Sequence, residues 1–355
     1  MIPSIIALFL DYKCNFRCKH CSINSGPNIS VPMSKEVFNA FFDQIRQVPS
    51  AKVLVFTGGE ATLQMPMLVE GIRRGKQAGL ITRLVTNAWW AKTESGAMEF
   101  LRKLKEAGLN EINTSFDDFH AEFIEINNGI NLAKAARALQ MTFCIGVISG
   151  KAARFDATFV KRNVSDALGI PLEKLDEEII IPEELPTPSG RGGSLDLDGL
   201  DPGDKINIGC SEVIKSLSVH PNGTIKLCCG HAMMDSDDLS LGNILEERLA
   251  DILNRGKKNV IYWWLHSKGP KRILETLGKT GCQYSSSCHA CQELFVNNRE
   301  LMLSYVAANK EAIIRDDILM GDQLKKIALT IGKKKEQIVS SIEVARKRRN
   351  SMESA

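Results

Sequence analysis

Apolar and polar positions alternate along the first half of the chain in a pattern that predicts a repeated strand–helix fold. Short apolar runs are separated by stretches in which apolar residues recur every three or four positions, as on one face of a helix. We interpret the apolar runs as strands, at Ile5–Tyr12, Lys52–Phe56, Ile81–Thr86, Glu111–Phe116, Thr142–Ile148 and Glu178–Ile181. Helices are predicted near Ser34–Gln47, Met67–Ala78, Glu94–Ala107, Ala121–Leu139 and Arg154–Leu168. Strands that alternate with helices pair in a parallel sheet, so the predicted fold class is α/β.

The composition changes near the middle of the chain and suggests a division into domains. Residues 182–203 are rich in proline and glycine, and we interpret this stretch as an exposed connection. The expected division is an α/β domain at 1–185, a linker at 186–203, a cysteine-rich domain at 204–295 and a helical basic tail at 296–355. The six strand candidates are too few for an eight-stranded barrel, so a partial barrel fits the first domain better.

Composition and charge exclude several classes of protein. Apolar residues make up 44% and charged residues 25%, which is ordinary for a globular chain and unlike a disordered or multi-span membrane protein. The apolar run Ile5–Leu10 is short and is followed by Asp11, so neither a signal peptide nor a membrane span is predicted, and a cytoplasmic location is expected. The net charge is only +3, and residues 325–355 hold nine basic and three acidic residues.

This basic tail motivates one hypothesis of a different class, a non-catalytic metal protein that contacts nucleic acid. Its positive charges include Lys333–Lys335 and Arg346–Arg349. The tail lacks the interleaved aromatic residues on which bases stack, and a charged terminal helix is more often a solvated surface. Nucleic acid is therefore not an expected partner.

Nine of the ten cysteines fall into two groups, and a chain without an export signal uses such groups as metal ligands or catalytic thiols. The first group has the spacing C-x3-C-x2-C and comprises Cys14, Cys18 and Cys21, directly after the first predicted strand. Three thiolates can hold three irons of a [4Fe–4S] cluster and leave the fourth iron open. The alternative is a zinc site that a histidine such as His20 completes.

The second group comprises Cys210, Cys228, Cys229, Cys282, Cys288 and Cys291. An Asn222-Gly223 pair predicts a β-hairpin that brings Cys210 and Cys228 together. A zinc knuckle with four cysteine ligands is the alternative to an iron–sulfur cluster. The Cys229 side chain, next to a proposed ligand, is expected to point away, and Cys144 is expected to be a small core residue.

The first cysteine motif, with His20 in the aromatic position of C-x3-C-x-aromatic-C, resembles the radical S-adenosylmethionine (SAM) superfamily. The loop Gly58-Gly59-Glu60 resembles the motif by which that family holds the SAM amino group. Two glycines allow close approach of the backbone, and a carboxylate pairs with an ammonium group. The resemblance implies a partial (β/α)6 barrel over about residues 5–185, with SAM and a [4Fe–4S] cluster bound at the carboxyl ends of its strands.

The same resemblance implies further SAM contacts at strand ends. The candidates are Asn87, Ser115, Gly146 and Ile148. The family's following glutamate is replaced by Ala153 in this chain, and each candidate has the alternative of satisfying its own turn. Asp117, Asp118 and His120 are candidate catalytic residues, with a helix cap before Ala121 as the alternative.

The second group resembles the SPASM and twitch extensions of radical SAM enzymes. The resemblance rests on the glycine before Cys228 and on the step Gly242-Asn243-Ile244. It implies one auxiliary [4Fe–4S] cluster, with ligands drawn from Cys210, Cys228, Cys282, Cys288 and Cys291. A full SPASM domain would need more cysteines than this chain has.

The implied activity is reductive cleavage of SAM to a 5′-deoxyadenosyl radical that abstracts hydrogen from a substrate C–H, with the auxiliary cluster aiding electron transfer. The implied function is maturation of a ribosomally made peptide. A dehydrogenase or rearrangement enzyme for a sugar, aminocyclitol or nucleotide is the alternative. Expected partners are an electron donor such as flavodoxin or ferredoxin and, because Cys14 is near the start, a separate leader-peptide-binding protein. The alternative is that the second domain itself recognises the peptide.

Overall fold

The computed structural model describes residues 1–319, and its centre is a nine-stranded sheet in the order β6-β5-β4-β3-β2-β1-β7-β8-β9. Strands β1 to β6 pair in parallel with their neighbours, as predicted for an α/β fold. The strands are β1 (Ile5–Phe9), β2 (Val53–Thr57), β3 (Ile81–Val85), β4 (Glu111–Ser115), β5 (Thr142–Ile148), β6 (Glu183–Glu184), β7 (Ser216–Val219), β8 (Thr224–Lys226) and β9 (Ser240–Asn243). The basic segments Lys333–Lys335 and Arg346–Arg349 lie outside the described residues.

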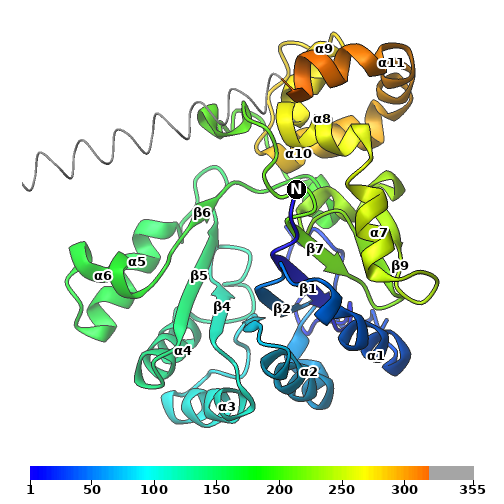
Figure 1. Ribbon diagram of the computed structural model, residues 1–355. Coiled ribbons are helices and arrows are strands. Elements are labelled where there is room, and N and C mark those ends of the chain that lie inside the picture. Colours follow the sequence, from blue (N-terminus) through cyan, green and yellow to red (C-terminus); the bar gives the residue numbers. More distant parts are fainter. Residues whose placement is uncertain (320–355) are drawn as a thin grey trace, which may run out of the picture.

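Helices cover the outer side of the parallel strands, and a second group of helices lies beyond β7 (Figure 1). The first group is α1 (Lys35–Gln44), α2 (Met65–Gln77), α3 (Glu94–Ala107), α4 (Ile126–Ala138), α5 (Ala157–Leu168) and α6 (Leu172–Glu178). The second is α7 (Leu249–Gly256), α8 (Val260–Lys268), α9 (Pro270–Thr276), α10 (Ser287–Gln292) and α11 (Arg299–Ala312). None of the helices within residues 1–319 is both long and apolar enough to cross a membrane.

Local sequence explains where these elements begin and which side they bury. Ser34, Thr93 and Asp156 each accept a hydrogen bond from a main-chain N–H in the first turn of α1, α3 and α5. In β4, Ile112 and Thr114 are buried beneath the helices, whereas the alternating residues Glu111, Asn113 and Ser115 are half-buried and face the inner side of the sheet. The inner side therefore remains available for a ligand.

The sixth strand was predicted at Glu178–Ile181, and that position is wrong. Leu172–Glu178 forms α6, and β6 follows at Glu183–Glu184. Ile180 makes only an isolated parallel bridge with Cys144. Pro182, between that bridge and β6, has no N–H to donate, so it interrupts the ladder.

The predicted start of the fourth helix, at Ala121, is also wrong. The Asp117 carboxylate accepts the main-chain N–H groups of Phe119 and His120 and folds this segment into a tight turn. Helix α4 begins only at Ile126, after Glu125 in an extended conformation.

The second half of the chain extends the sheet of the first half. Strand β7 pairs in parallel with β1, and β8 and β9 follow in antiparallel order. The predicted hairpin is confirmed, with Gly223 at φ 87° in the turn between β7 and β8. Because β1 and β7 are parallel neighbours, the loops that follow them lie at the same edge of the sheet.

The connection at 186–203 was expected to be exposed, but part of it is buried. Pro186, Thr187, Ser189 and Gly192 are buried, and a short 3₁₀ turn, η3, spans Gly190–Ser194. The main-chain N–H of Arg191 donates to the carbonyl oxygen of Cys21 at 3.0 Å. This segment therefore packs directly on the first cysteine loop.

Candidate functional site

A cavity of about 340 Å³ opens where the parallel strands end. Its wall contains the last residue of each of the first five strands, namely Phe9, Thr57, Val85, Ser115 and Ile148. This is the edge of a parallel sheet at which ligands and catalytic groups generally lie.

The three cysteines of the first group line this cavity together. Cys14 and Cys18 are buried, and Cys21 is half-buried. Burial raises the pKa of the Cys14 thiol to about 11 and that of Cys18 to about 12, and the neighbouring thiols add to both shifts. Three closely spaced thiolates are therefore unfavourable unless a cationic group binds them, which is the behaviour of a metal-cluster site.

The Gly58-Gly59-Glu60 loop has a different geometry from the one expected. Gly58 and Gly59 line the cavity, whereas the Glu60 side chain does not and is only 1% exposed. Its oxygens accept hydrogen bonds from Thr62 N and Oγ1, Thr86 Oγ1 and Asn87 N. Glu60 thus joins the loops after β2 and β3, and its four accepted hydrogen bonds favour a positioning role over the expected direct contact with a ligand ammonium group.

The two glycines are required by close packing against the segment that leads to Cys14. A Cβ atom at Gly58 would lie 2.2 Å from the Asp11 carbonyl oxygen, and one at Gly59 would lie 2.1 Å from that of Lys13. The N–H of Gly59 and that of Glu60 donate to these same two oxygens at 2.8 Å. The glycine loop therefore supports the cysteine loop from behind.

Of the strand-end candidates, the structure places three in the cavity wall and one outside it. Asn87, Ser115 and Ile148 line the cavity. The Asn87 side-chain amide lies 3.6 Å from Cys14 Sγ. Gly146 is not among the lining residues, because its position on β5 is set two residues back from the strand end.

The three proposed catalytic residues separate into different roles. Asp117 Oδ1 accepts hydrogen bonds from Phe119 N, His120 N and His120 Nδ1, and Oδ2 accepts one from Ile148 N. Burial raises the pKa of Asp117, but His120 and these N–H groups lower it more, so the net pKa lies below its usual value. Asp117 is fully buried, and it positions His120, which does line the cavity.

Asp118 does not line the cavity. Its carboxylate accepts hydrogen bonds from the main-chain N–H groups of Arg154 and Phe155 and from Arg154 Nε. These bonds tie the turn after β4 to the segment before α5. The predicted catalytic role of Asp118 gains no support from this arrangement, because both of its oxygens are occupied by Arg154 and Phe155 outside the cavity wall.

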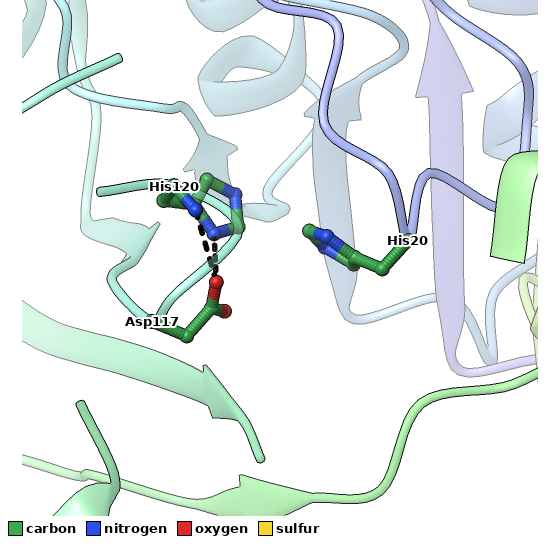
Figure 2. Close-up of side chains that lie close together, drawn as sticks. All are labelled: His20, Asp117 and His120. Carbon is green, nitrogen blue, oxygen red and sulfur yellow. Dashed lines mark hydrogen bonds and ion pairs between the residues drawn. The ribbon is translucent and has the colours of Figure 1, made fainter. Parts of the chain in front are cut away.

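His20 approaches the Asp117–His120 pair from the cysteine loop (Figure 2). The ligand atoms of the three residues lie within 4.8 Å of one another. A metal ion there would have to displace the hydrogen bonds that already occupy Asp117 Oδ1. These three residues therefore fit a hydrogen-bonded part of the cavity wall better than a metal site.

Several buried polar atoms at the cavity have no hydrogen-bond partner among residues 1–319. They are His20 Nδ1, Ser25 Oγ and Arg191 Nη2. Arg191 also donates from Nε to the Cys18 carbonyl oxygen at 2.9 Å. Buried polar atoms of this kind are costly unless a ligand or water satisfies them, so the wall is built for a polar ligand.

Four cysteines of the second group are brought together. The thiols of Cys210, Cys228, Cys288 and Cys291 interact electrostatically, and burial and then these neighbours raise the pKa of Cys228 and Cys291 well above the usual value. A Cβ atom at Gly230 would lie 3.1 Å from Cys288 Sγ and 3.5 Å from Cys228 Sγ, and Gly230 N donates to Cys228 Sγ. The geometry fits a four-thiolate cluster site.

The two remaining cysteines of the second group, Cys282 and Cys229, have different surroundings. Cys282 is exposed and interacts with Tyr284, which favours a spare thiol over a cluster ligand. The Cys229 side chain was expected to point away from the auxiliary site, and it lines the first cavity together with Gly230 and His231. The only sequence signal for this role was its position next to Cys228, which does not reveal the direction of a side chain.

Comparisons with known proteins give two matches to families. Residues 11–148 match the radical SAM superfamily, and residues 210–292 match SPASM, an iron–sulfur cluster-binding domain. The chain is 20% identical over 317 residues to YydG of Bacillus subtilis (strain 168), whose name provisionally assigns it to peptide biosynthesis, and the alignment covers 86% of this chain and 96% of YydG. It is 31% identical over 153 residues to a GTP 3′,8-cyclase of Listeria welshimeri serovar 6b, which covers 41% of this chain and 43% of the cyclase. The structure of BtrN in complex with AdoMet and 2-DOIA has 15% identity and a TM-score of 0.46, with 79% of this chain and 91% of BtrN covered.

Residues 11–148 are a radical SAM domain, and residues 210–292 are a SPASM iron–sulfur domain. The protein is a radical SAM enzyme whose cofactors are SAM, a SAM-binding [4Fe–4S] cluster and an auxiliary iron–sulfur cluster. The residues present fit these groups. Three thiols share one cavity with unpartnered polar atoms, and four further thiols face one another.

Proposed function

We propose that this enzyme modifies a peptide. The observation that carries the proposal is the similarity to YydG, which extends through both domains and covers 96% of that protein. The similarity to GTP 3′,8-cyclase covers less than half of either chain, and so supports the shared radical SAM chemistry more than a shared substrate.

The cofactors would be held by residues from both halves of the chain. Cys14, Cys18 and Cys21 would bind the SAM-binding cluster, and Ser25 and Arg191 would offer hydrogen bonds to SAM. When bound, the cluster and SAM together supply the oxidant that removes hydrogen from a substrate C–H. Glu60 and Asp117 hold the surrounding loops in place through their hydrogen bonds.

The auxiliary cluster would be held by Cys210, Cys228, Cys288 and Cys291. Four cysteine ligands leave no iron open for a substrate, which favours electron transfer over substrate binding at this cluster. The loop that carries Cys228 continues through Cys229 and His231 into the cavity wall. A substrate in the cavity would therefore lie between the two cluster-binding loops.

Co-expression with short peptides encoded beside the gene tests the proposal. We expect one peptide to change in mass, or to take up deuterium from D2O when the product is mass-neutral, as detected by mass spectrometry. The control is the Cys14→Ala/Cys18→Ala/Cys21→Ala variant, which should leave the peptide unchanged. A leader-peptide-binding protein and flavodoxin or ferredoxin would be supplied in the same strain.

A negative result with peptides and a positive result with small molecules would overturn the peptide proposal. The specific contrary outcome is loss of two hydrogens from a sugar alcohol or aminocyclitol by the wild type but not by the triple variant. That result would leave the radical SAM assignment intact and replace only the substrate.

A further inference from the structure

A buried hydrogen-bond chain links the two cysteine loops. Tyr12, two residues before Cys14, has its hydroxyl 2.6 Å from His220 Nδ1. His220 Nε2 lies 2.9 Å from Ser218 Oγ, and Ser218 Oγ donates to the carbonyl oxygen of Cys228 at 2.8 Å. The chain thus runs from the end of β1 to the backbone of a proposed auxiliary-cluster ligand.

The direction of this chain follows from the number of protons available. A carbonyl oxygen only accepts hydrogen bonds, so the Ser218 hydroxyl must donate its one proton to the carbonyl oxygen of Cys228. The Ser218 oxygen then accepts a hydrogen bond from His220 Nε2–H. His220 Nδ1 is therefore unprotonated and accepts a hydrogen bond from the Tyr12 hydroxyl. Met233 Sδ also lies 3.1 Å from Ser218 Oγ, but a thioether is the weaker acceptor.

The surroundings hold His220 neutral and fixed. Its side chain is 2% exposed and stacks on Phe9 with ring centroids 4.6 Å apart. Burial, and then the nearby Lys226, lower the pKa of His220 to about 3, so the ring carries a single N–H. Every donor in the chain therefore points its positive end toward Cys228.

We propose that Tyr12, His220 and Ser218 form an oriented dipole chain that raises the reduction potential of the auxiliary cluster through Cys228. Hydrogen bonds and dipoles near cluster ligands set the potentials of iron–sulfur clusters, and positive ends directed at the cluster favour its reduced state. The three residues are positioning residues, and the proposal rests on Cys228 being a ligand in the proposed function.

Anaerobic redox titration of the holoenzyme, followed by electron paramagnetic resonance, tests the proposal. We expect Ser218→Ala to shift the auxiliary midpoint potential to more negative values. The shift should be smaller in His220→Phe, which keeps an aromatic ring against Phe9, and smallest in Tyr12→Phe. Tyr262→Phe is the matched control, because its buried hydroxyl also donates to a carbonyl, that of Asp238, but is not joined to a cysteine.

The combination Ser218→Ala/Tyr12→Phe separates a dipole chain from ordinary structural support. Once Ser218 is removed, Tyr12→Phe should cause no further shift, because the connection to Cys228 is already broken. Additive shifts, or an unchanged potential in Ser218→Ala, would overturn the proposal. Full iron retention in Cys228→Ala would instead show that the ligand assignment, and with it the proposed function of the auxiliary site, is at fault.

Discussion

The main-chain N–H of Asn87 donates a hydrogen bond to Glu60 Oε2 at 2.8 Å. Thr86 Oγ1 donates to the other carboxylate oxygen at 2.8 Å. These bonds join the loop after β3 to the loop after β2, and the same loops carry Gly59 and Asn87 into the cavity wall. The shape of the cavity therefore depends on a side chain that does not line it.

Replacing Glu60 with Gln should destabilise this junction. Each carboxylate oxygen accepts at least one main-chain N–H, from Thr62 or Asn87, so either amide orientation places an N–H against an N–H. We expect the free energy of unfolding to fall by about 2 kcal/mol, measured by urea denaturation. Glu70→Gln, an exposed change on α2, is the control and should be neutral within about 0.5 kcal/mol. Equal losses of stability in the two variants would contradict the role of Glu60 in joining the loops after β2 and β3.

Gly59→Ala should displace the cysteine loop. The new Cβ would lie 2.1 Å from the Lys13 carbonyl oxygen, and the neighbouring backbone has to move to relieve the clash. We expect a loss of about 3 kcal/mol in the free energy of unfolding and weaker SAM binding, measured by equilibrium dialysis. Gly150→Ala has open space around its Cβ and should bind SAM normally. Normal binding by both variants would show that the loop is not held as described.

Asp117→Asn should change the pH dependence of stability. The pKa of Asp117 is lowered in the fold, mainly by His120 once the opposing effect of burial is overcome. Its contribution is therefore complete above the unfolded pKa of about 3.9 and is lost as the pH falls through the lower folded value. We expect the variant to lose about 2 kcal/mol at pH 7 and progressively less below about pH 4.

The readout is the difference in the free energy of unfolding between Asp117→Asn and the exposed control Asp43→Asn at each pH. A difference is needed because acid also releases the clusters from both variants. Asp43 is 73% exposed and forms a surface ion pair with Arg74. A difference that stayed constant from pH 7 to pH 3 would show that Asp117 is not preferentially ionised in the fold.

Iron content should separate the cluster ligands from the two spare thiols. After anaerobic reconstitution we expect about eight irons in the wild type and about four in the Ala variants of Cys210, Cys228, Cys288 or Cys291. Cys282→Ala and Cys229→Ala should keep about eight, because the former thiol is exposed and the latter faces the first cavity. Loss of about four irons in Cys282→Ala would return that residue to the ligand set.

Alkylation should show that Cys229 shares the cavity of SAM. Burial raises the pKa of the Cys229 thiol to about 11, so little thiolate exists at neutral pH and its reaction with iodoacetamide is slow. Bound SAM should slow it further, whereas Cys282, which is exposed like Cys229 but does not line the cavity, should react at the same rate with and without SAM. Peptide mapping of the holoenzyme measures both sites in one sample. An identical response to SAM at both would place Cys229 outside the cavity.

Much of the fold could be predicted from the sequence because strand and helix periods are local. The pattern located Thr142–Ile148 and Glu94–Ala107 at their observed bounds. It failed near Pro182 and Asp117, where a missing N–H and a side-chain hydrogen bond to the backbone override the local apolar pattern. The first cysteine site could be predicted for the same reason, because Cys14, Cys18 and Cys21 lie close together along the chain.

Contacts between distant residues could not be predicted in this way. Glu60 finds Thr86 and Asn87 only when β2 and β3 pair, and Arg191 reaches Cys18 only when the connecting segment folds back on the cysteine loop. No pattern in the neighbourhood of either residue indicates its partner. The direction of the Cys229 side chain depends in the same way on how the second domain docks.

The sequence by itself determined that three thiols share one short loop, because a few residues of chain cannot separate them far. It also determined the order of strands and helices, because side-chain periodicity is set by local backbone geometry. Only the tertiary structure decided that Cys210, Cys228, Cys288 and Cys291 meet while Cys282 stays apart. The pairing of β7 with β1 also placed His220 beside Tyr12. The physical reason is that long-range positions are set by sheet pairing and packing between segments, on which the spacing of residues along the chain places almost no limit.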